Sequence, residues 1–527
     1  MKKRSTIIAG VVAVAVMAGF TGCSGGDADK KDSKKEQKVE EKVDSDFEVS
    51  YDGIKTASLN VGLSVHDPSI FESDGTYYIY GSHMATAKST DLRNWTMVAD
   101  GYGKNSVYGD LMFRDDPFEY TGNLNSVIPT DDGNCHVWAP DVIYNKAQKL
   151  YYMYFCTSST WNASNLCYAT SKSPEGPFDW KGALIYSGFN SKTIKKTDVL
   201  DYVGEDYAKE HYIKEIGDEY NYEECPNAID PTVFYDENDR LWMVYGSWSG
   251  GIFLLELDEK TGKVIHPEAD PEKDIDAYFG KRLIGGGHTS MEAPYILYDE
   301  KSGYYYLYIS YGTLTREGGY QIRVFRSKTP DGDYVDMNGQ APGIGKGNPA
   351  YFGLKLSGNY MLPSLEMAYM ATGHNSAFID KDGKRYIVNH TRFDNDSEYH
   401  EPRVHQYFLN EEGWPCMLPY ATGGETISES GYGMDKVAGE YYVINQGMKV
   451  DKEIAEPFKL MLTEKGNVFG KGITGTWEMK KDSCYVHITY KEKEYSGVFC
   501  EMKDEADTPV MTFTAVGSNE SIWGVKY

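Results

Sequence analysis

The stretch His66-Asp67-Pro68-Ser69-Ile70 opens a short hydrophobic run, which a turn and the aromatic strand Tyr77-Tyr78-Ile79-Tyr80 follow. The chain repeats this pattern four more times. The later runs begin at Ala139-Pro140-Asp141-Val142, Ile229-Asp230-Pro231-Thr232-Val233, Glu292-Ala293-Pro294-Tyr295 and His374-Asn375-Ser376-Ala377-Phe378. A hairpin repeated in this way is typical of a radial all-β architecture, in which the residues that open the innermost strands converge on one axis.

Three of these openings carry a carboxylate, namely Asp67, Asp230 and Glu292. We interpret them as standing at the same place in the repeat, and we therefore expect them to share one axial pocket. Like charges in one pocket repel one another, so their pKa values should separate into a proton donor and a base. Glycoside hydrolysis needs that pair. An isolated Asp-Pro pair usually only caps a turn, but a structural protein gains little from burying three like charges.

The composition favours an exported globular protein that acts on a neutral ligand. At 527 residues the chain predicts two domains. Its net charge of −26 argues against nucleic acid or an acidic polysaccharide as ligand, because like charges repel. A neutral glycan is compatible with this charge. Most of the 44 tyrosines suit strands, and a minority would suit a sugar-binding cleft.

Residues 1–23 have the pattern of a bacterial secretion signal. A basic start is followed by an apolar stretch that is short for a transmembrane helix, and the stretch ends at Phe20-Thr21-Gly22-Cys23. This ending resembles a lipobox, so we expect lipidation at Cys23. The polar residues 24–46 then predict a flexible tether. The protein should be exported and held at the cell surface by its lipid alone.

The strand pattern divides the rest of the chain. We expect a propeller catalytic domain over residues 47–420 and, after the turn residues that follow Tyr420, a small β-barrel or sandwich over residues 425–527. This second domain would brace the propeller or bind glycan. The scattered cysteines after Cys23 argue against a disulfide framework and structural zinc, although Cys484 and Cys500 could pair across a hairpin.

Several longer motifs resemble glycoside hydrolase family 43, in particular its endo-α-1,5-L-arabinanases with a C-terminal β domain. They are Cys135-His136-Val137-Trp138-Ala139-Pro140-Asp141, Asn227-Ala228-Ile229-Asp230-Pro231, Tyr245-Gly246-Ser247-Trp248-Ser249-Gly250-Gly251-Ile252, Glu292-Ala293-Pro294-Tyr295 and Gly373-His374-Asn375-Ser376. The resemblance implies a five-bladed β-propeller and an inverting mechanism. It implies Asp67 as general base, Glu292 as general acid and Asp230 as the residue that orients Glu292. It also implies a metal, with calcium expected, near the axis at His374.

Other residues of these motifs are candidates for substrate binding. We expect Trp248 to stack on a furanose ring, because the glycines after it leave its surroundings open. Trp138 could stack in the same way or fill a blade interface. The candidate partners for sugar hydroxyls are Asn227, Ser247 and Ser249.

The motifs predict inverting endo-hydrolysis of arabinan by a monomer, with plant cell-wall arabinan and arabino-oligosaccharides as substrates. An exo-acting arabinofuranosidase or β-xylosidase on the same fold is the alternative within the enzyme class. Long insertions at about 101–134, 188–226 and 312–372 would decide between an open groove and a blocked cleft. A non-catalytic glycan-binding lipoprotein is the alternative from another class, and the presence of all three carboxylates argues against it.

Overall fold

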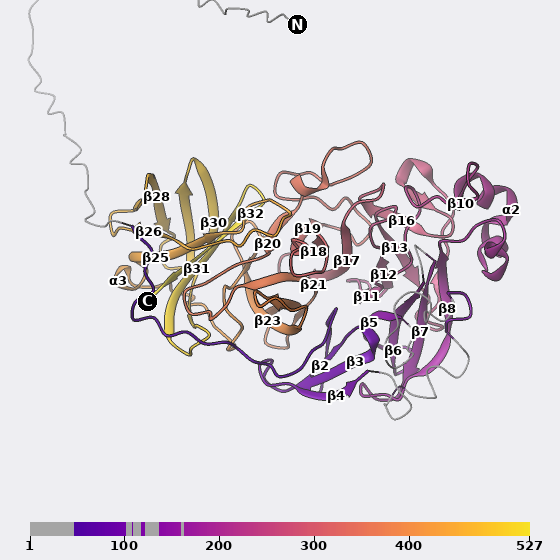
Figure 1. Cartoon of the computed structure of the whole chain (residues 1–527), viewed down its shortest axis with the longest axis horizontal. Helices are drawn as coiled ribbons and strands as arrows, with labels where there is room; N and C mark the ends of the chain where they lie inside the picture. The colour runs from indigo at the N-terminus through magenta and orange to yellow at the C-terminus, as the bar shows by residue number, and fades with distance from the viewer. Residues whose placement is uncertain (1–46, 102–107, 109–116, 122–135, 160–162) are drawn as a thin grey trace, which may run out of the picture. The chain divides into compact units, whose positions relative to one another are not determined.

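The structure is a computed structural model that describes residues 47–101, 108, 117–121, 136–159 and 163–527 (Figure 1). The predicted signal and tether lie outside the described residues. Among the described residues, five sheets of four or more strands follow one another along the chain, with a two-stranded sheet between the second and third, and a closed barrel follows them. The expected fold class is therefore confirmed, and the C-terminal domain is a barrel rather than a sandwich.

The first two sheets, or blades, are four-stranded antiparallel meanders. Blade 1 contains β1 (Ser69–Ser73), β2 (Thr76–Tyr80), β3 (Ala85–Ser89) and β4 (Thr96–Asp100). Blade 2 contains β5 (Val137–Asn145), β6 (Leu150–Ser158), β7 (Ser164–Ser171) and β8 (Asp179–Ser187). Between blades 2 and 3 the insertion contains η2 (Thr193–Lys196), α2 (Val199–His211), β9 (Ile213–Lys214) and β10 (Glu219–Tyr220).

Blade 3 has two extra short strands at its outer edge. It contains β11 (Thr232–Tyr235), β12 (Leu241–Tyr245), β13 (Ile252–Leu257), β14 (Val264–Ile265), β15 (Ile275–Asp276) and β16 (Gly280–Ile284), with η3 (Pro271–Lys273). Blade 4 contains β17 (Met291–Asp299), β18 (Tyr304–Tyr311), β19 (Gln321–Ser327) and β20 (Leu354–Ser357), with η4 (Pro349–Tyr351). Blade 5 contains β21 (Tyr369–Ile379), β22 (Arg385–Phe393), β23 (His400–Leu409) and β24 (Pro415–Met417).

The first strands of the blades close a ring. Contacts link β1 to β5, β5 to β11, β11 to β17, β17 to β21 and β21 back to β1. Because blades pack face to face, their middle strands are covered on both sides, as in β18, where Tyr305, Tyr306, Leu307 and Tyr308 are fully buried. Separate apolar clusters fill the spaces between successive blades, and the cluster around Val65 and Val388 joins blade 5 to blade 1. The aromatic strands that repeat in the sequence therefore form the hydrophobic core between the blades.

The barrel follows the short helix α3 (Met434–Val437). Its strands are β25 (Gly439–Asn445), β26 (Phe458–Leu462), β27 (Asn467–Gly470), β28 (Ile473–Met479), β29 (Tyr485–Tyr490), β30 (Lys493–Lys503), β31 (Pro509–Gly517) and β32 (Glu520–Lys526). Apolar side chains such as Phe499 and Phe513 fill its interior. A second apolar cluster joins the barrel to blades 4 and 5. In it the rings of Tyr360 and Trp523 pack edge to face, with their centroids 5.0 Å apart. Cys484 and Cys500 are buried free thiols.

Within the described part of the chain, we find no helix with both the length and the apolar character that a membrane crossing requires.

Candidate active site

Each blade begins with the same unusual backbone conformation. The residues Asp67, Ala139, Asp230, Ala293 and His374 have positive φ angles of 55°, 43°, 55°, 56° and 46°. A proline follows each of the first four. L-residues rarely adopt this left-handed region, so five occurrences at corresponding strand starts mark a functional feature of the backbone. The pairing register also shifts directly after this position in blades 2, 4 and 5, which is a β-bulge.

This backbone register corrects one expectation from the sequence. Asp67 and Asp230 occupy the positive-φ position, but Ala293 occupies it in blade 4. Glu292 therefore stands one residue earlier, in the position that His66, Trp138 and Ile229 hold in their blades. The three carboxylates do not share one place in the repeat. They nevertheless meet, because side chains from both positions line the same cavity.

That cavity has a volume of about 600 Å³ and lies where the blades meet. Its walls include Asp67, Asp230, Glu292, His374 and Trp138. Four of the predicted catalytic and metal residues and one predicted substrate residue are therefore brought together.

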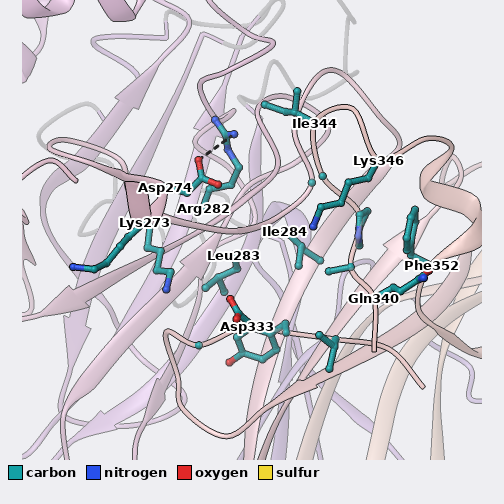
Figure 2. Close-up of a pocket in the computed structure, with 18 of the residues that line it drawn as sticks. Lys273, Asp274, Arg282, Leu283, Ile284, Asp333, Gln340, Ile344, Lys346 and Phe352 are labelled. Carbon is teal, nitrogen blue, oxygen red and sulfur yellow. Dashed lines mark ion pairs between the residues drawn. The ribbon is translucent and has the colours of Figure 1, made fainter. Parts of the chain in front are cut away.

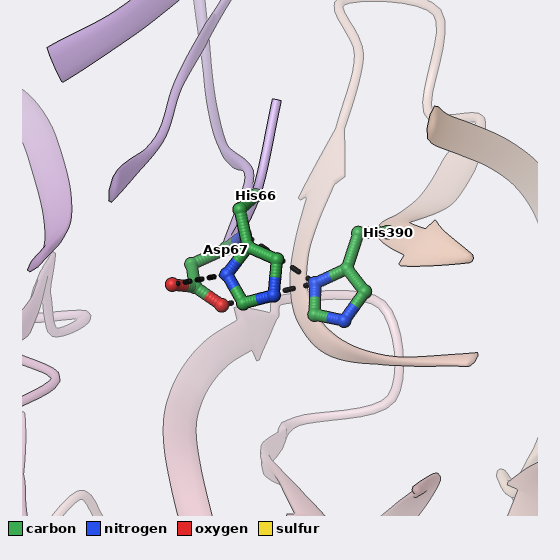
Figure 3. Close-up of side chains that lie close together, drawn as sticks. All are labelled: His66, Asp67 and His390. Carbon is green, nitrogen blue, oxygen red and sulfur yellow. Dashed lines mark hydrogen bonds and ion pairs between the residues drawn. The ribbon is translucent and has the colours of Figure 1, made fainter. Parts of the chain in front are cut away.

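Asp67 is buried among histidine and hydroxyl partners, of which Figure 3 draws His66 and His390. Its carboxylate pairs with His374 Nδ1 at 2.9 Å and with His66 Nδ1 at 2.8 Å, and it accepts a hydrogen bond from Ser82 Oγ. Its backbone N–H donates to His390 Nδ1. Burial alone would raise the pKa of Asp67, but His374 and His66 together hold it well below the ordinary value. Asp67 is therefore a carboxylate at neutral pH, which suits a base.

His374 and Asp230 complete the charged group on the axis. Burial opposes the charge on His374, but the neighbouring Asp67, Asp230 and Glu292 raise its pKa to about 9. The imidazole is therefore a cation at neutral pH. Burial raises the pKa of Asp230 to about 7, with His374 opposing the rise and the other two carboxylates adding to it. Asp230 also accepts the Ala293 N–H at 3.1 Å, which links it to the residue after Glu292.

Glu292 has neutral partners. Its Oε2 accepts hydrogen bonds from Trp248 Nε1 at 2.8 Å and Ser247 Oγ at 3.1 Å, and its Oε1 accepts one from Tyr320 at 2.7 Å. Trp248 and Ser247 come from the loop after β12, and Tyr320 immediately precedes β19. They fix the direction of the carboxyl group without placing a cation against it.

The other predicted substrate residues lie at different depths. Asn227 Oδ1 lies 3.5 Å from the hydroxyl of Ser187, outside the residues that form the cavity wall. Ser249 is fully buried, and its Oγ lies 3.3 Å from His288 Nδ1. Ser249 is not among the residues that form the cavity wall. Ser247 and Trp248 donate hydrogen bonds to Glu292, so they lie directly beside this carboxylate.

The whole ordered architecture matches known proteins. Residues 61–215 and 217–415 match the model of glycosyl hydrolases family 43, and residues 419–524 match a model described as a C-terminal lipocalin-like domain. The chain belongs to glycosyl hydrolase family 43.

Relatives within family 43 match across nearly the whole chain. The extracellular endo-α-(1→5)-L-arabinanase 2 of Bacillus subtilis is 36% identical over 482 residues, which cover 88% of this chain and 93% of the relative. The corresponding extracellular enzyme of Thermotoga petrophila has the same identity and coverage. The crystal structure of the endo-1,5-α-L-arabinanase of T. petrophila in complex with Tris covers 88% of this chain and 98% of that chain, with a TM-score of 0.74 and 36% identity.

The family 43 resemblance raised the question of calcium at His374. One imidazole nitrogen of His374 already pairs with Asp67, whose oxygens also serve His66 and Ser82. The potential ligand atoms that do lie within 4.8 Å of one another belong to His66, Asp67 and His390. Two nitrogens and one carboxylate are not the oxygen-rich set that calcium prefers. The side chains therefore fit calcium only if water supplies most of its ligands.

Sequence reasoning missed four residues that hold Asp67 and Glu292 in place, namely His66, Ser82, His390 and Tyr320. His66 stands directly before Asp67, so it was visible in the first motif. Ser82 and Tyr320 each come from the same blade as the carboxylate they contact, whereas His390 comes from blade 5 and reaches Asp67 because the ring of blades closes. Asp141, in the second repeated run, is a buried link between blades, because it accepts hydrogen bonds from Ser69 and from the Val233 N–H.

A larger cavity lies elsewhere, between the rims of blades 3 and 4 (Figure 2). It has a volume of about 1040 Å³. Its charged side chains include Asp274 and Arg282, which face each other in an ion pair at 3.6 Å. It contains none of the buried carboxylates of the axis, so we place the chemistry in the smaller cavity.

Proposed function

We propose that this protein is an endo-α-1,5-L-arabinanase, which cleaves internal linkages of arabinan. The observation that carries this proposal is the pairing of two differently held carboxylates in one cavity, with Asp67 paired to the imidazoles of His374 and His66 and Glu292 among neutral donors. The two relatives at 36% identity, both endo-acting arabinanases, support this choice of substrate.

In the proposed reaction each group has its own step. Asp67, a carboxylate at neutral pH, takes a proton from a water molecule as that water attacks the anomeric carbon. Glu292 delivers a proton to the leaving oxygen, and the donors Trp248, Ser247 and Tyr320 hold its carboxyl group in place. Asp230 and His374 determine the charge in the space between Asp67 and Glu292. The product should have inverted configuration, because water attacks the face opposite the leaving group.

Two measurements test this proposal. Products from linear arabinan should be a series of internal fragments, whereas an exo-acting enzyme would release one product from a chain end throughout the reaction. Proton NMR of the first product should show inversion at the anomeric carbon. Net retention would overturn the assignment of Asp67 as a base acting through water.

We also propose that the protein is exported and anchored by lipid at Cys23, and that it acts as a monomer. The relatives named as extracellular support export. The lipobox-like sequence at Phe20-Thr21-Gly22-Cys23 supports the anchor. Cys23→Ser should release the protein from the membrane fraction without lowering its activity. Continued membrane association of this variant would reject lipidation at Cys23.

Calcium near His374 remains part of the proposal for the charge on the axis. Calcium would add positive charge beside three carboxylates, which favours their ionised forms. His374 is a competing source, because its neighbours already keep it protonated. Treatment with a chelator distinguishes calcium from His374 as the source of positive charge.

A further inference from the structure

A second cleft is lined by residues that lead into the strand of Glu292. It has a volume of about 610 Å³, and one wall is formed by Thr289 and Ser290, which immediately precede β17 and Glu292. Tyr311, at the end of β18, lies opposite Met291 in the sheet and lines the same wall. The propeller rim adds Tyr351 from η4. The same chain segment therefore lines the cleft and leads into β17, the strand that carries Glu292.

The barrel supplies the remaining wall through the loop between β25 and β26, which brings Met448, Lys449, Val450 and Asp451 to the cleft. This loop is held by buried side chains of blade 4. Gln321 Nε2 donates to the Lys449 carbonyl at 2.9 Å, and the fully buried Arg323 donates to the Met448 carbonyl at 2.7 Å.

The loop also packs against the hairpin that leads to Tyr320. A Cβ at Gly319, where φ is 69°, would approach the Asp451 carbonyl oxygen to 2.6 Å. Tyr320, the next residue, donates to Glu292. The barrel therefore reaches within one residue of a group that positions the acid, and it does so with a firmly anchored segment.

The chemistry of the cleft suits a neutral sugar chain. Tyr351 is 70% exposed, which is unusual for a large aromatic side chain and leaves its ring face available for stacking. The hydroxyls of Thr289 and Tyr311 are buried polar atoms that have no hydrogen-bond partner among the described residues. Buried hydroxyls without partners are costly. A ligand rich in hydroxyl groups supplies both donors and acceptors, together with an apolar ring face.

We propose that this cleft binds the leaving-group portion of the arabinan chain, so that the barrel forms part of a distal substrate subsite. The inference rests on the proposed arabinanase function. The acid stands beside the leaving oxygen in glycoside hydrolysis. The part of the polymer that extends past Glu292 toward Thr289 and Tyr351 is therefore the part that carries the reducing end.

Tyr351→Ala tests the subsite without disturbing the core, because the side chain is exposed. A distal contact binds ground state and transition state alike, so its loss should raise KM for long arabinan about 3- to 10-fold and leave kcat nearly unchanged. Kinetics on nitrophenyl arabinofuranoside should not change, because that substrate is too short to reach the cleft. Lys449→Ala, which keeps the anchoring carbonyl, should act in the same direction and more weakly.

A cleavage map assigns the direction of the chain. On arabinohexaose labelled at its reducing end, loss of a distal leaving-group contact should shift cleavage toward that end and shorten the labelled products. Tyr202→Ala is the matched control, because Tyr202 is a 53% exposed tyrosine on α2, in the insertion between blades 2 and 3. It should change neither KM nor the map.

Unchanged KM and an unchanged map in Tyr351→Ala would overturn the subsite and leave the arabinanase function standing. Longer labelled products would also overturn it, because they would place the cleft on the other side of the scissile bond. Failure of the wild-type protein to hydrolyse any arabinan would instead reject the proposed function itself.

Discussion

The starts of blades 1 and 4 share one backbone and differ in how they hold their carboxylates. In blade 1, Asp67 has the positive φ angle and faces His66 and His374. In blade 4 the positive φ angle belongs to Ala293, and Glu292 one residue earlier faces Trp248 and other neutral donors. Similar motifs thus deliver two carboxyl groups into different electrostatic surroundings.

In the proposed mechanism this difference separates an acid from a base. A buried carboxylate needs opposite charge to stay ionised, and the protonated His374 supplies it at Asp67. An acid must instead exchange its proton during each turnover, and neutral donors orient it without binding that charge permanently. A shift of one residue within the motif selects which surroundings the side chain meets.

Exchanging each carboxylate for its amide should give the largest effects. Asp67→Asn removes the base and Glu292→Gln removes the acid, so either should lower turnover on arabinan at least about 10²-fold. The two variants should differ on a substrate with an activated leaving group, which needs little protonation. Steady-state kinetics on arabinan and on nitrophenyl arabinofuranoside measure this difference.

Testing both variants on arabinan and on nitrophenyl arabinofuranoside provides an internal control. Glu292→Gln should recover much of its activity on the activated substrate, and Asp67→Asn should not, because attack by water still needs a base. Equal losses for Glu292→Gln on both substrates would contradict its assignment as the acid. Equal recovery in both variants would contradict the separation of roles between blades 1 and 4.

Removal of metal should give the next largest effect and tests what keeps Asp67 ionised. If calcium supplies the charge, exhaustive EDTA treatment should lower activity and move the acidic limb of the pH profile upward, because the pKa of Asp67 rises when positive charge is removed. Added calcium should reverse both changes. Protein shown by elemental analysis to be metal-free, with full activity and an unchanged profile, would leave His374 as the cation.

A smaller effect should come from disturbing the neutral partners of Glu292. Tyr320→Phe removes one hydrogen bond and should lower kcat about 10-fold, the scale for a hydrogen bond to a charged group. Gly373→Ala should reproduce this loss indirectly, because a Cβ at Gly373 would overlap the Tyr320 ring. Combining the two substitutions should cost less than the product of their separate effects. Fully multiplicative losses would show that Gly373 acts through another residue.

Much of the fold was predictable because its signal is local. Each blade repeats a hydrophobic run, a turn and an aromatic strand, and burial of both faces explains why tyrosine and tryptophan recur in the middle strands. The insertion expected at about 188–226 contains the helix α2. The closure of the second domain into a barrel was left open, since short alternating strands suit a sandwich equally well.

The site was predictable only in part. Asp67 and Asp230 carry a recognisable Asp-Pro motif, but their backbone angles and the offset of Glu292 depend on bulges that the sequence does not mark. His390 reaches Asp67 through closure of the ring between blades 5 and 1, which is a long-range event, and Tyr320 reaches Glu292 through the pairing of strands within blade 4. The fully buried Ser249 shows the converse, because a polar residue inside a family motif need not face the substrate.

Lys355 is a buried basic group like His374, but its partner is a backbone carbonyl rather than a carboxylate. Its ammonium donates to the Lys449 carbonyl at 3.2 Å, where propeller and barrel meet. Burial, reinforced by Arg323, lowers the pKa of Lys355 from 10.5 to about 7, whereas carboxylates raise that of His374 to about 9. The same burial thus favours loss of the proton in one place and its retention in the other.

This pKa makes stability depend on pH in a defined direction. The unfolded chain binds more protons than the folded one between about pH 7 and 10.5, so the contribution of Lys355 to the free energy of unfolding rises with pH, by up to about 1.4 kcal/mol per pH unit. Lys355→Met should remove this rise while keeping the side-chain length. Denaturant unfolding of both proteins at pH 7.5, 8.5 and 9.5 measures the difference, in which contributions from the tyrosines cancel. Parallel stability profiles would mean that Lys355 keeps its proton in the folded protein, and that the Lys449 carbonyl and the nearby acidic groups compensate its charge as fully as Asp67 compensates that of His374.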